Sequence, residues 1–188
     1  MTAAAQPSRR GFLQGSVAVL TLAVTAKGLV TAAWAADTTA QKYGADTMPG
    51  GTVDDPLVFV SIAPDGTVTI VAHRAEMGTG VRTSLPMVVA DEMEANWDRV
   101  KVVQAEANET RYGNQNVDGS RSVRHFLLPM RRVGAAARQM LEAAAAAHWS
   151  VPVSEVKAVQ HEVLHQRTGR RLGYGELAAD AAKQPVPK

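Results

Sequence analysis

Small and polar residues that could bind an anion are gathered in two short segments of this sequence. The first segment, residues 76–80, reads EMGTG and comes just before a helix-like pattern. Its Gly78 and Gly80, on either side of Thr79, permit a positive φ and a close approach of the backbone to a ligand. The first amides of the following helix are free to bind an anion. A lone Gly-x-Gly is no dinucleotide fingerprint, so a structural turn is the competing interpretation, and Glu76 is either a base or a solvated or capping carboxylate.

The second segment, residues 118–122, reads DGSRS and also leads into a helix-like pattern. Gly119, Ser120 and Ser122 provide small size, backbone N–H groups and hydroxyl donors, a set suited to phosphate or another polyanion. The alternative is that Ser120 or Ser122 only caps the helix. We call the two segments the first corner and the second corner. Together they suggest an anion site more strongly than either does alone.

Other residue types contribute little to the chemistry. The chain has no cysteine, which excludes disulfides, Cys-ligated zinc and Cys-held iron–sulfur clusters within it. His161 and His165 have the spacing of a helical metal pair, but their segment resembles a hairpin and supplies no third ligand. No serine lies in a nucleophile elbow. We therefore identify no catalytic residue and no metal site.

The elements that must position the two corners follow from periodicity and turn residues. A hairpin is predicted over 57–73 around Pro64–Gly66, and a helix from Thr83 or Ser84, either of which is a possible N-cap. The helix presents Leu85, Val88, Val89 and Met93 to the core. A strand near 100–104 and a long polar loop follow.

The remaining elements are a long helix and a second hairpin. The helix is predicted from about Ser122 to Trp149, with a kink or a join of two helices at Pro129. Its apolar face consists of Val133, Ala137, Met140, Leu141, Ala144 and His148. A strand near Val156, a hairpin around Thr168–Gly169 and a short helix from Gly175 complete the order β-β-α-β-loop-α-β-β-α. Helices mixed with hairpins favour the α+β class over a doubly wound parallel sheet.

The N-terminus has the pattern of a bacterial export signal. Arg9 and Arg10 precede an uncharged stretch, 11–26, and Ala33-Trp34-Ala35 fits a cleavage site. Paired arginines before Phe-Leu resemble the twin-arginine type, which exports folded proteins and thus favours a cofactor protein. An uncleaved membrane anchor is the alternative, although Lys27 shortens the apolar run.

These patterns divide the chain into four parts. We predict a twin-arginine signal peptide (1–35), a polar linker (36–56), the folded domain (57–182) and a tail (183–188), with a periplasmic location that includes the option of membrane association. Residues 1–35 hold three basic residues and no acid, so 17 Lys and Arg face 18 Asp and Glu in the rest. This near-neutral body lacks a basic patch, which excludes nucleic-acid binding.

Four motifs in sequence order carry a family resemblance across residues 55–182. They are IAPDGTVTIVAHRAEMGTGVRTSLPMVVADEM, DGSRSVR, RRVGAAARQMLEAAAAAHWSVP and GRRLGYGELAADAA. The chain resembles the xanthine dehydrogenase/aldehyde oxidase family of molybdenum hydroxylases, specifically the large, molybdopterin-binding subunit of the isoquinoline 1-oxidoreductase type, also seen in membrane-associated aldehyde dehydrogenases. The resemblance implies a partial molybdopterin-binding α+β domain.

The resemblance also implies a cofactor, contact residues and partners. The cofactor is molybdopterin with molybdenum, commonly in its cytosine dinucleotide form, and the implied contacts are Gly78 and Gly80 in the first corner and Gly119, Ser120 and Ser122 in the second. Thr79 stands where the family usually has glutamine, so a shorter hydroxyl or a water must replace the amide. The implied partners are a small [2Fe–2S] subunit, a cytochrome c as electron acceptor and the twin-arginine export machinery.

The implied reaction is hydroxylation of an N-heterocycle or oxidation of an aldehyde with oxygen derived from water. Family subunits are several times longer, and their general-base glutamate has no counterpart in these 188 residues. We therefore expect the N-terminal part, native or truncated, of an exported large subunit that contributes one wall of the cofactor site. The alternatives are a short non-catalytic binding or assembly module and an inactive fragment.

Overall fold

The computed structural model describes residues 50–187, so the predicted signal peptide and most of the predicted linker lie outside the described residues. The elements are α3 (Pro56–Phe59), β1 (Val60–Ile62), β2 (Val68–Ala72), α4 (Val81–Glu92), the 3-10 helix η2 (Trp97–Arg99), β3 (Val100–Gln104), α5 (Glu109–Tyr112), α6 (Arg121–Trp149), η3 (Val153–Glu155), β4 (Val156–Val159), β5 (Glu162–His165), β6 (Arg171–Gly173) and α7 (Tyr174–Ala181). Helices are mixed with two small sheets, which confirms the α+β class. None of these helices is both long and apolar enough to cross a membrane.

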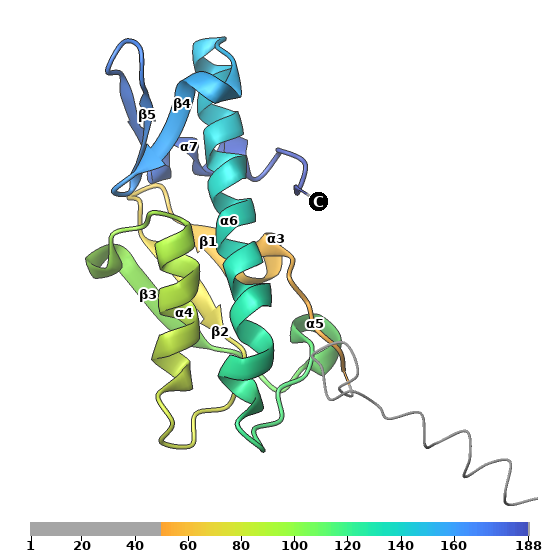
Figure 1. The fold of residues 1–188 in the computed structure, drawn as a ribbon. Coiled ribbons are helices and arrows are strands. Elements are labelled where there is room, and N and C mark those ends of the chain that lie inside the picture. Colours follow the sequence, from red (N-terminus) through yellow and green to blue (C-terminus); the bar gives the residue numbers. More distant parts are fainter. Residues whose placement is uncertain (1–49, 188) are drawn as a thin grey trace, which may run out of the picture. The chain divides into compact units, whose positions relative to one another are not determined.

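The first sheet has the order β1-β2-β3, with β2 in the centre. β1 pairs with β2 in antiparallel fashion, Val60 opposite Ile70, which confirms the first predicted hairpin. β3 runs parallel to β2, with Val68 opposite Val100. A parallel pair needs a crossover connection, and α4 lies within that connection and packs on β2 and β3 (Figure 1). The start of α4 is thereby held at one end of the sheet.

The second sheet is antiparallel, with the order β4-β5-β6. Val156 lies opposite His165 and Glu162 opposite Gly173, which confirms the predicted strand near 156 and the hairpin around Thr168–Gly169. This sheet packs on α6 near the C-terminal end of that helix, whereas the second corner lies at its N-terminal end (Figure 1). The two corners and the second sheet are therefore at opposite ends of the domain.

Helix α6 is the axis of the domain, and it continues through Pro129 as one helix of 29 residues. The predicted join of two helices at Pro129 is therefore wrong. Proline costs helix stability because it lacks an N–H, but Pro129 and Met130 are buried in the core, and this packing outweighs the cost. The predicted apolar face is buried except for His148, which is exposed because it lies in the last turn.

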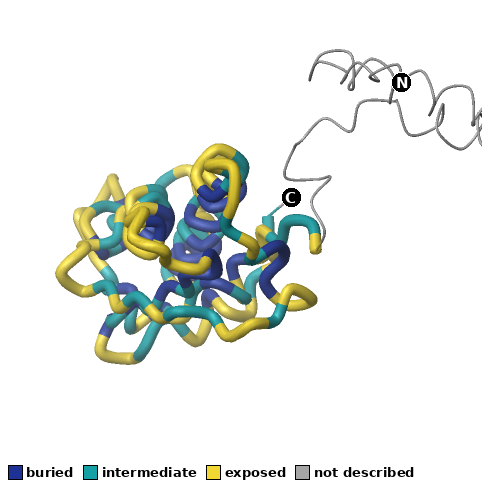
Figure 2. Tube along the Cα trace, turned by 90° about the horizontal axis from the view of Figure 1, so that it is seen from below, coloured by how far each residue is buried: buried dark blue, intermediate teal, exposed yellow. Residues whose placement is uncertain are grey.

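Helices α4 and α6 pack side by side through a glycine. A Cβ built at Gly134 would lie 2.5 Å from the carbonyl oxygen of Val89, so no larger residue fits at this crossing. The buried residues around it form the core, and their backbone is dark blue in Figure 2. Prominent members are Phe59, Val68, Ile70, Leu85, Val89, Met93, Phe126, Met130, Val133 and Leu141. The α4–α6 contact fixes the separation of the two helix starts.

Two predicted boundaries differ from the structure. Residues 57–59, expected to begin a strand, form the short helix α3 together with Pro56. The Asp55 side chain accepts a hydrogen bond from the Leu57 amide, and Pro56 occupies the first helical position. Helix α4 begins at Val81 with Gly80 as its N-cap, so the prediction of Thr83 or Ser84 as the N-cap is wrong. The Glu76 carboxylate accepts hydrogen bonds from the amides of Gly80 and Arg82, which explains this earlier start.

Candidate functional site

The two corners border one hollow of about 450 Å³. Its lining comes from the segments that lead into α4 and α6, and both helices begin at the same end of the domain (Figure 1). Its lining residues are Met77, Thr79, Val81, Val117, Asp118, Gly119, Ser120, Arg121, Ser122 and Val123. Of the predicted contacts, Thr79, Gly119, Ser120 and Ser122 line the hollow, and Gly78 and Gly80 flank Thr79 in the chain. The structure thus brings together two segments that are about 40 residues apart in sequence.

The first corner needs its glycines for backbone conformation. Gly78 has φ 88° and Gly80 has φ 76°, values in the left-handed region that a side chain disfavours. A Cβ at either position would meet no atom of the described residues within 4 Å. The glycines therefore create the turn and leave open space beside it, and no protein backbone needs to approach them closely.

Glu76 occupies the start of α4. Its two carboxylate oxygens accept hydrogen bonds from the amides of Gly80 and Arg82, each at 3.0 Å. These bonds hold the pKa of Glu76 below its ordinary value, the Arg82 bond most of all. Of the two roles left open for this residue, capping is the one that the geometry supports. The amides of Gly80 and Arg82 are thus already used, so the expectation of free amides at the first corner is wrong for these two.

The second corner remains open. Gly119 and Ser120 both have positive φ, 49° and 57°, and no side chain in the described part of the chain caps α6. The interpretation of Ser120 or Ser122 as a simple side-chain cap is therefore wrong. Arg121 forms an ion pair with Asp118 at 3.3 Å, and Arg74 binds the Ser122 hydroxyl. The Arg121 amide donates to the Asp118 carbonyl, while the next residues of this turn, Ser122 and Val123, line the hollow at the positive dipole end of α6, where no side-chain cap bonds the helix.

Arg74 joins the first corner to the second, a role that the sequence analysis missed. This residue is 1% exposed, and its Nε donates to Ser122 Oγ at 3.2 Å. Its Nη1 donates to Asn114 Oδ1 at 2.7 Å, and the guanidinium also bonds the backbone oxygens of Asn114 and Asn116. The available signal was a charged residue that lies two positions after the end of a strand and just before a glycine turn.

His73, the neighbour of Arg74, is a neutral core residue. It is 1% exposed, and its ring packs edge-on against Phe59 and Phe126 at centroid distances of 5.3 and 4.8 Å. Neither ring nitrogen has a hydrogen-bond partner among the described residues. Burial, with a smaller contribution from Arg74, lowers the pKa of His73 to about 3. His73 therefore supports the first corner as an uncharged ring.

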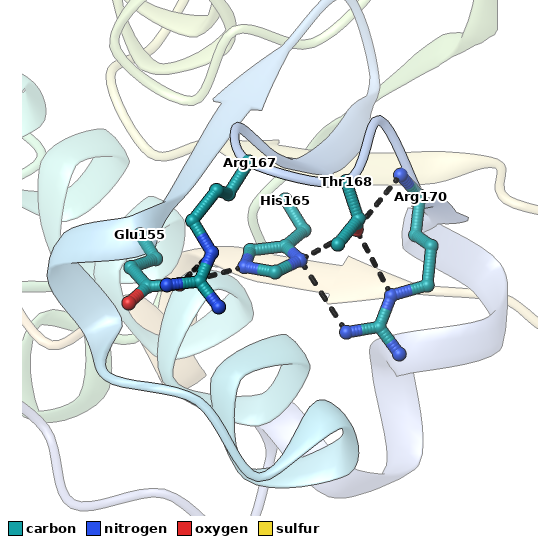
Figure 3. A network of polar contacts seen from close by, with 5 residues as sticks. All are labelled: Glu155, His165, Arg167, Thr168 and Arg170. Atoms are coloured by element: carbon teal, nitrogen blue, oxygen red, sulfur yellow. Dashed lines mark hydrogen bonds and ion pairs between the residues drawn. The ribbon is translucent and has the colours of Figure 1, made fainter.

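The remaining buried histidines brace the opposite end of the domain. His165 Nε2 lies 2.9 Å from Glu155 Oε2, and its Nδ1 lies 2.6 Å from Thr168 Oγ1, which also accepts from Arg170 (Figure 3). His161 accepts from the Asn96 amide through Nδ1 and donates from Nε2 to the Gly66 carbonyl. Residues 50–187 hold no group of three side chains suited to a metal ion. These histidines tie loops together far from the hollow.

Comparison with known proteins gives a consistent family. A model described as "molybdopterin cofactor-binding domain" matches residues 20–187. The chain is 40% identical over 178 residues to the isoquinoline 1-oxidoreductase subunit beta of Brevundimonas diminuta. The aligned region covers 92% of this chain and 22% of that protein. The chain is 32% identical over 134 residues to a membrane-bound aldehyde dehydrogenase [pyrroloquinoline-quinone] of Gluconacetobacter polyoxogenes, with coverage of 71% and 17%.

A solved structure shares the fold. Quinoline 2-oxidoreductase from Pseudomonas putida 86 matches with a TM-score of 0.53 and 19% identity, covering 67% of this chain and 16% of that chain. The chain thus spans about a fifth of the length of the curated relatives that it matches.

Proposed function

The chain belongs to the molybdopterin cofactor-binding domain family, and from this premise we propose that it supplies one wall of a molybdopterin site in an exported molybdenum hydroxylase large subunit. The observation that carries the proposal is the hollow shared by the two corners. Six predicted contacts lie on or beside it, and it opens onto the uncapped start of α6. Its volume of about 450 Å³ is in the range of small-molecule sites.

The donor set of the hollow fits the phosphate-bearing part of such a cofactor. The amides of Ser122 and Val123 and the Ser120 hydroxyl would bind phosphate oxygens, while the Arg121 amide already donates to the Asp118 carbonyl. The Ser122 hydroxyl would donate from the buried side of the same turn. Thr79, which replaces the glutamine usual in the family, would reach the cofactor with its hydroxyl. The bound group would supply the molybdenum redox chemistry, while this wall would bind, orient and exclude water.

The finer features of the proposal follow from the relatives. The name of the Brevundimonas protein as a subunit beta supports further subunits, for which we propose a small [2Fe–2S] protein and a cytochrome c. We propose the cytosine dinucleotide form of the cofactor, and N-heterocycles or aldehydes as substrates, in line with the names of the two relatives. Export to the periplasm rests on Arg9 and Arg10, and their replacement by lysine should retain the chain in the cytoplasmic fraction.

Two glycines provide a matched test of the site. Gly80 and Gly169 have φ of 76° and 74°, and a Cβ at either position would lie more than 4 Å from the neighbouring side chains and backbone of residues 50–187. Gly80→Val and Gly169→Val should each cost about 1–2 kcal/mol of unfolding free energy through strain. Only Gly80→Val should lower the molybdenum and pterin content of the purified, exported chain, measured by metal analysis and pterin fluorescence. A folded wild-type chain without pterin would instead support the non-catalytic binding module.

A further inference from the structure

We propose that Arg74 is a positioning residue, which orients the Ser122 hydroxyl and the 114–116 segment so that the hollow accepts the phosphate end of its ligand. This inference rests on the proposed function, since it concerns the same hollow. Arg74 does not line the hollow itself, whereas Ser122 does. Arg74 therefore acts on a ligand through its neighbours.

The guanidinium of Arg74 contacts the 114–116 segment and the first two turns of α6. Its guanidinium donates to Ser122 Oγ, to both oxygens of Asn114 and to the Asn116 carbonyl, and it lies 4.4 Å from the centroid of the Phe126 ring. A guanidinium presents its donors in a fixed planar fork. The fork therefore sets the relative positions of four acceptor atoms, from three residues that are up to eight positions apart in sequence.

The charge of Arg74 is not neutralised by these contacts. Every one of its hydrogen-bond acceptors is a hydroxyl, an amide or a backbone carbonyl, and no carboxylate of residues 50–187 forms an ion pair with it. Burial lowers the pKa of Arg74, while the more distant Asp118 and Glu109 oppose that effect. Arginine stays protonated in proteins, so a positive charge lies behind the wall of the hollow and favours an anion in front of it.

The bond to Ser122 also fixes what that hydroxyl can do. Ser122 Oγ accepts from Arg74 Nε at 3.2 Å, so the hydroxyl hydrogen must point elsewhere. Ser122 is 8% exposed and lines the hollow, which leaves the hollow as the direction in which a ligand oxygen can accept that hydrogen. Arg74 thereby makes Ser122 a donor toward the ligand. The second corner recognises an anion only when this arrangement is intact.

The test is a double-mutant cycle on the full chain with inorganic pyrophosphate as the probe. Amide shifts of Ser122 and Val123 are followed by NMR during the titration, with sodium chloride of equal ionic strength as the control. Ser122→Ala and Arg74→Lys should each weaken binding about tenfold, since a hydrogen bond to a charged group is worth about that much. The double variant should also bind pyrophosphate only about tenfold more weakly than the wild type, because each single change already removes the same Arg74–Ser122 hydrogen bond.

The measured affinities of the three variants distinguish a positioning role of Arg74 from the alternatives. Losses that multiply in the double variant would mean that Arg74 and Ser122 act independently, and unchanged affinity in both single variants would leave Arg74 a purely structural role. Either result overturns the inference, as does the absence of pyrophosphate binding by the folded wild-type chain. If Arg74→Lys does not fold, Ser122→Ala alone still decides, because its unchanged affinity would refute a donor role. Pterin missing from a folded chain that binds pyrophosphate overturns the proposed function and leaves this inference standing.

Discussion

The two corners look alike in sequence and differ in the structure. Each places small residues at positive φ directly before a helix, and both border the same hollow. In the first corner the Glu76 carboxylate binds the amides at the start of α4, whereas in the second corner no side chain of the described residues caps α6. A glycine turn before a helix is therefore an anion site only if the protein has not already supplied its own anion.

The corners also differ in the buried residues that hold them in place. The first follows His73 and Arg74, which are both buried at the end of β2. The second corner is held by the guanidinium of Arg74, which lies just before the first corner in the chain. The first corner is thus part of the core, and the second depends on a long-range contact. Variants that affect the support, the turn and the cap separately can test this difference.

The largest effect is expected from removal of the side-chain acceptor of Arg74 in the loop of the second corner. Asn114→Leu should lower the free energy of unfolding by about 3 kcal/mol, because it leaves a buried charge short of a hydrogen bond. Asn116 bonds Arg74 only through its backbone oxygen, so Asn116→Ala is the matched control and should change stability by less than about 0.5 kcal/mol. Urea unfolding measures both. Equal effects would show that Arg74 does not hold this loop through Asn114.

Acid should weaken the support of the first corner through His73. Its pKa of about 3 in the folded chain lies below 6.5, so between these values only the unfolded chain takes up the proton, and stability falls as the pH falls. Between pH 7 and pH 5 the loss is about 2 kcal/mol. His73→Leu, of similar volume, removes this contribution, and it breaks no hydrogen bond of the ring with residues 50–187. Thermal unfolding at both pH values should show a smaller acid loss in the variant, and an identical loss would contradict the neutral ring.

The two corners share a left-handed backbone conformation, held by a glycine in the first and by a serine in the second, so opposite substitutions can test it. Gly78→Ala places a side chain at φ 88° and should cost about 1 kcal/mol of unfolding free energy. Ser120→Gly relieves the same kind of strain at φ 57° and should raise stability by about 0.5 kcal/mol, less than the full relief because glycine gains freedom in the unfolded chain. Chemical denaturation of both proteins measures the signs. Two changes of the same sign would show that the corners do not share this conformation.

The smallest effect is expected at the exposed cap of the first corner. Glu76→Gln keeps an oxygen that can accept from one amide but loses the charge, so the melting temperature should fall slightly at neutral pH. Because the pKa of Glu76 is lowered, this stabilisation is lost as the pH falls through the folded value. The difference between wild type and variant should therefore vanish in acid. A difference in melting temperature that persists in acid would mean that it does not come from the charge of the Glu76 carboxylate.

Much of the fold was predictable because it depends on local patterns. Alternation and a Pro-Asp-Gly turn predicted the first hairpin, and apolar spacing predicted α4 and α6 nearly to their ends. The errors arose where distant or side-chain contacts intervene. Glu76 moved the start of α4, and packing on both sides carried α6 through Pro129. Neither effect leaves a signal in the periodicity.

The sequence by itself determined most of the secondary-structure order, the two glycine-containing turns and the family motifs, because these follow from side-chain type and spacing along one segment. The predicted order lacked the short helices α3 and α5 and one strand of the second sheet. Only the tertiary structure decided that the corners share a hollow, that one of them is closed by Glu76 and that Arg74 links them. The physical reason is that the parallel pairing of β2 with β3 and the glycine contact between α4 and α6 set distances between segments that are far apart in sequence. A spacing rule along one chain segment contains no information about such distances.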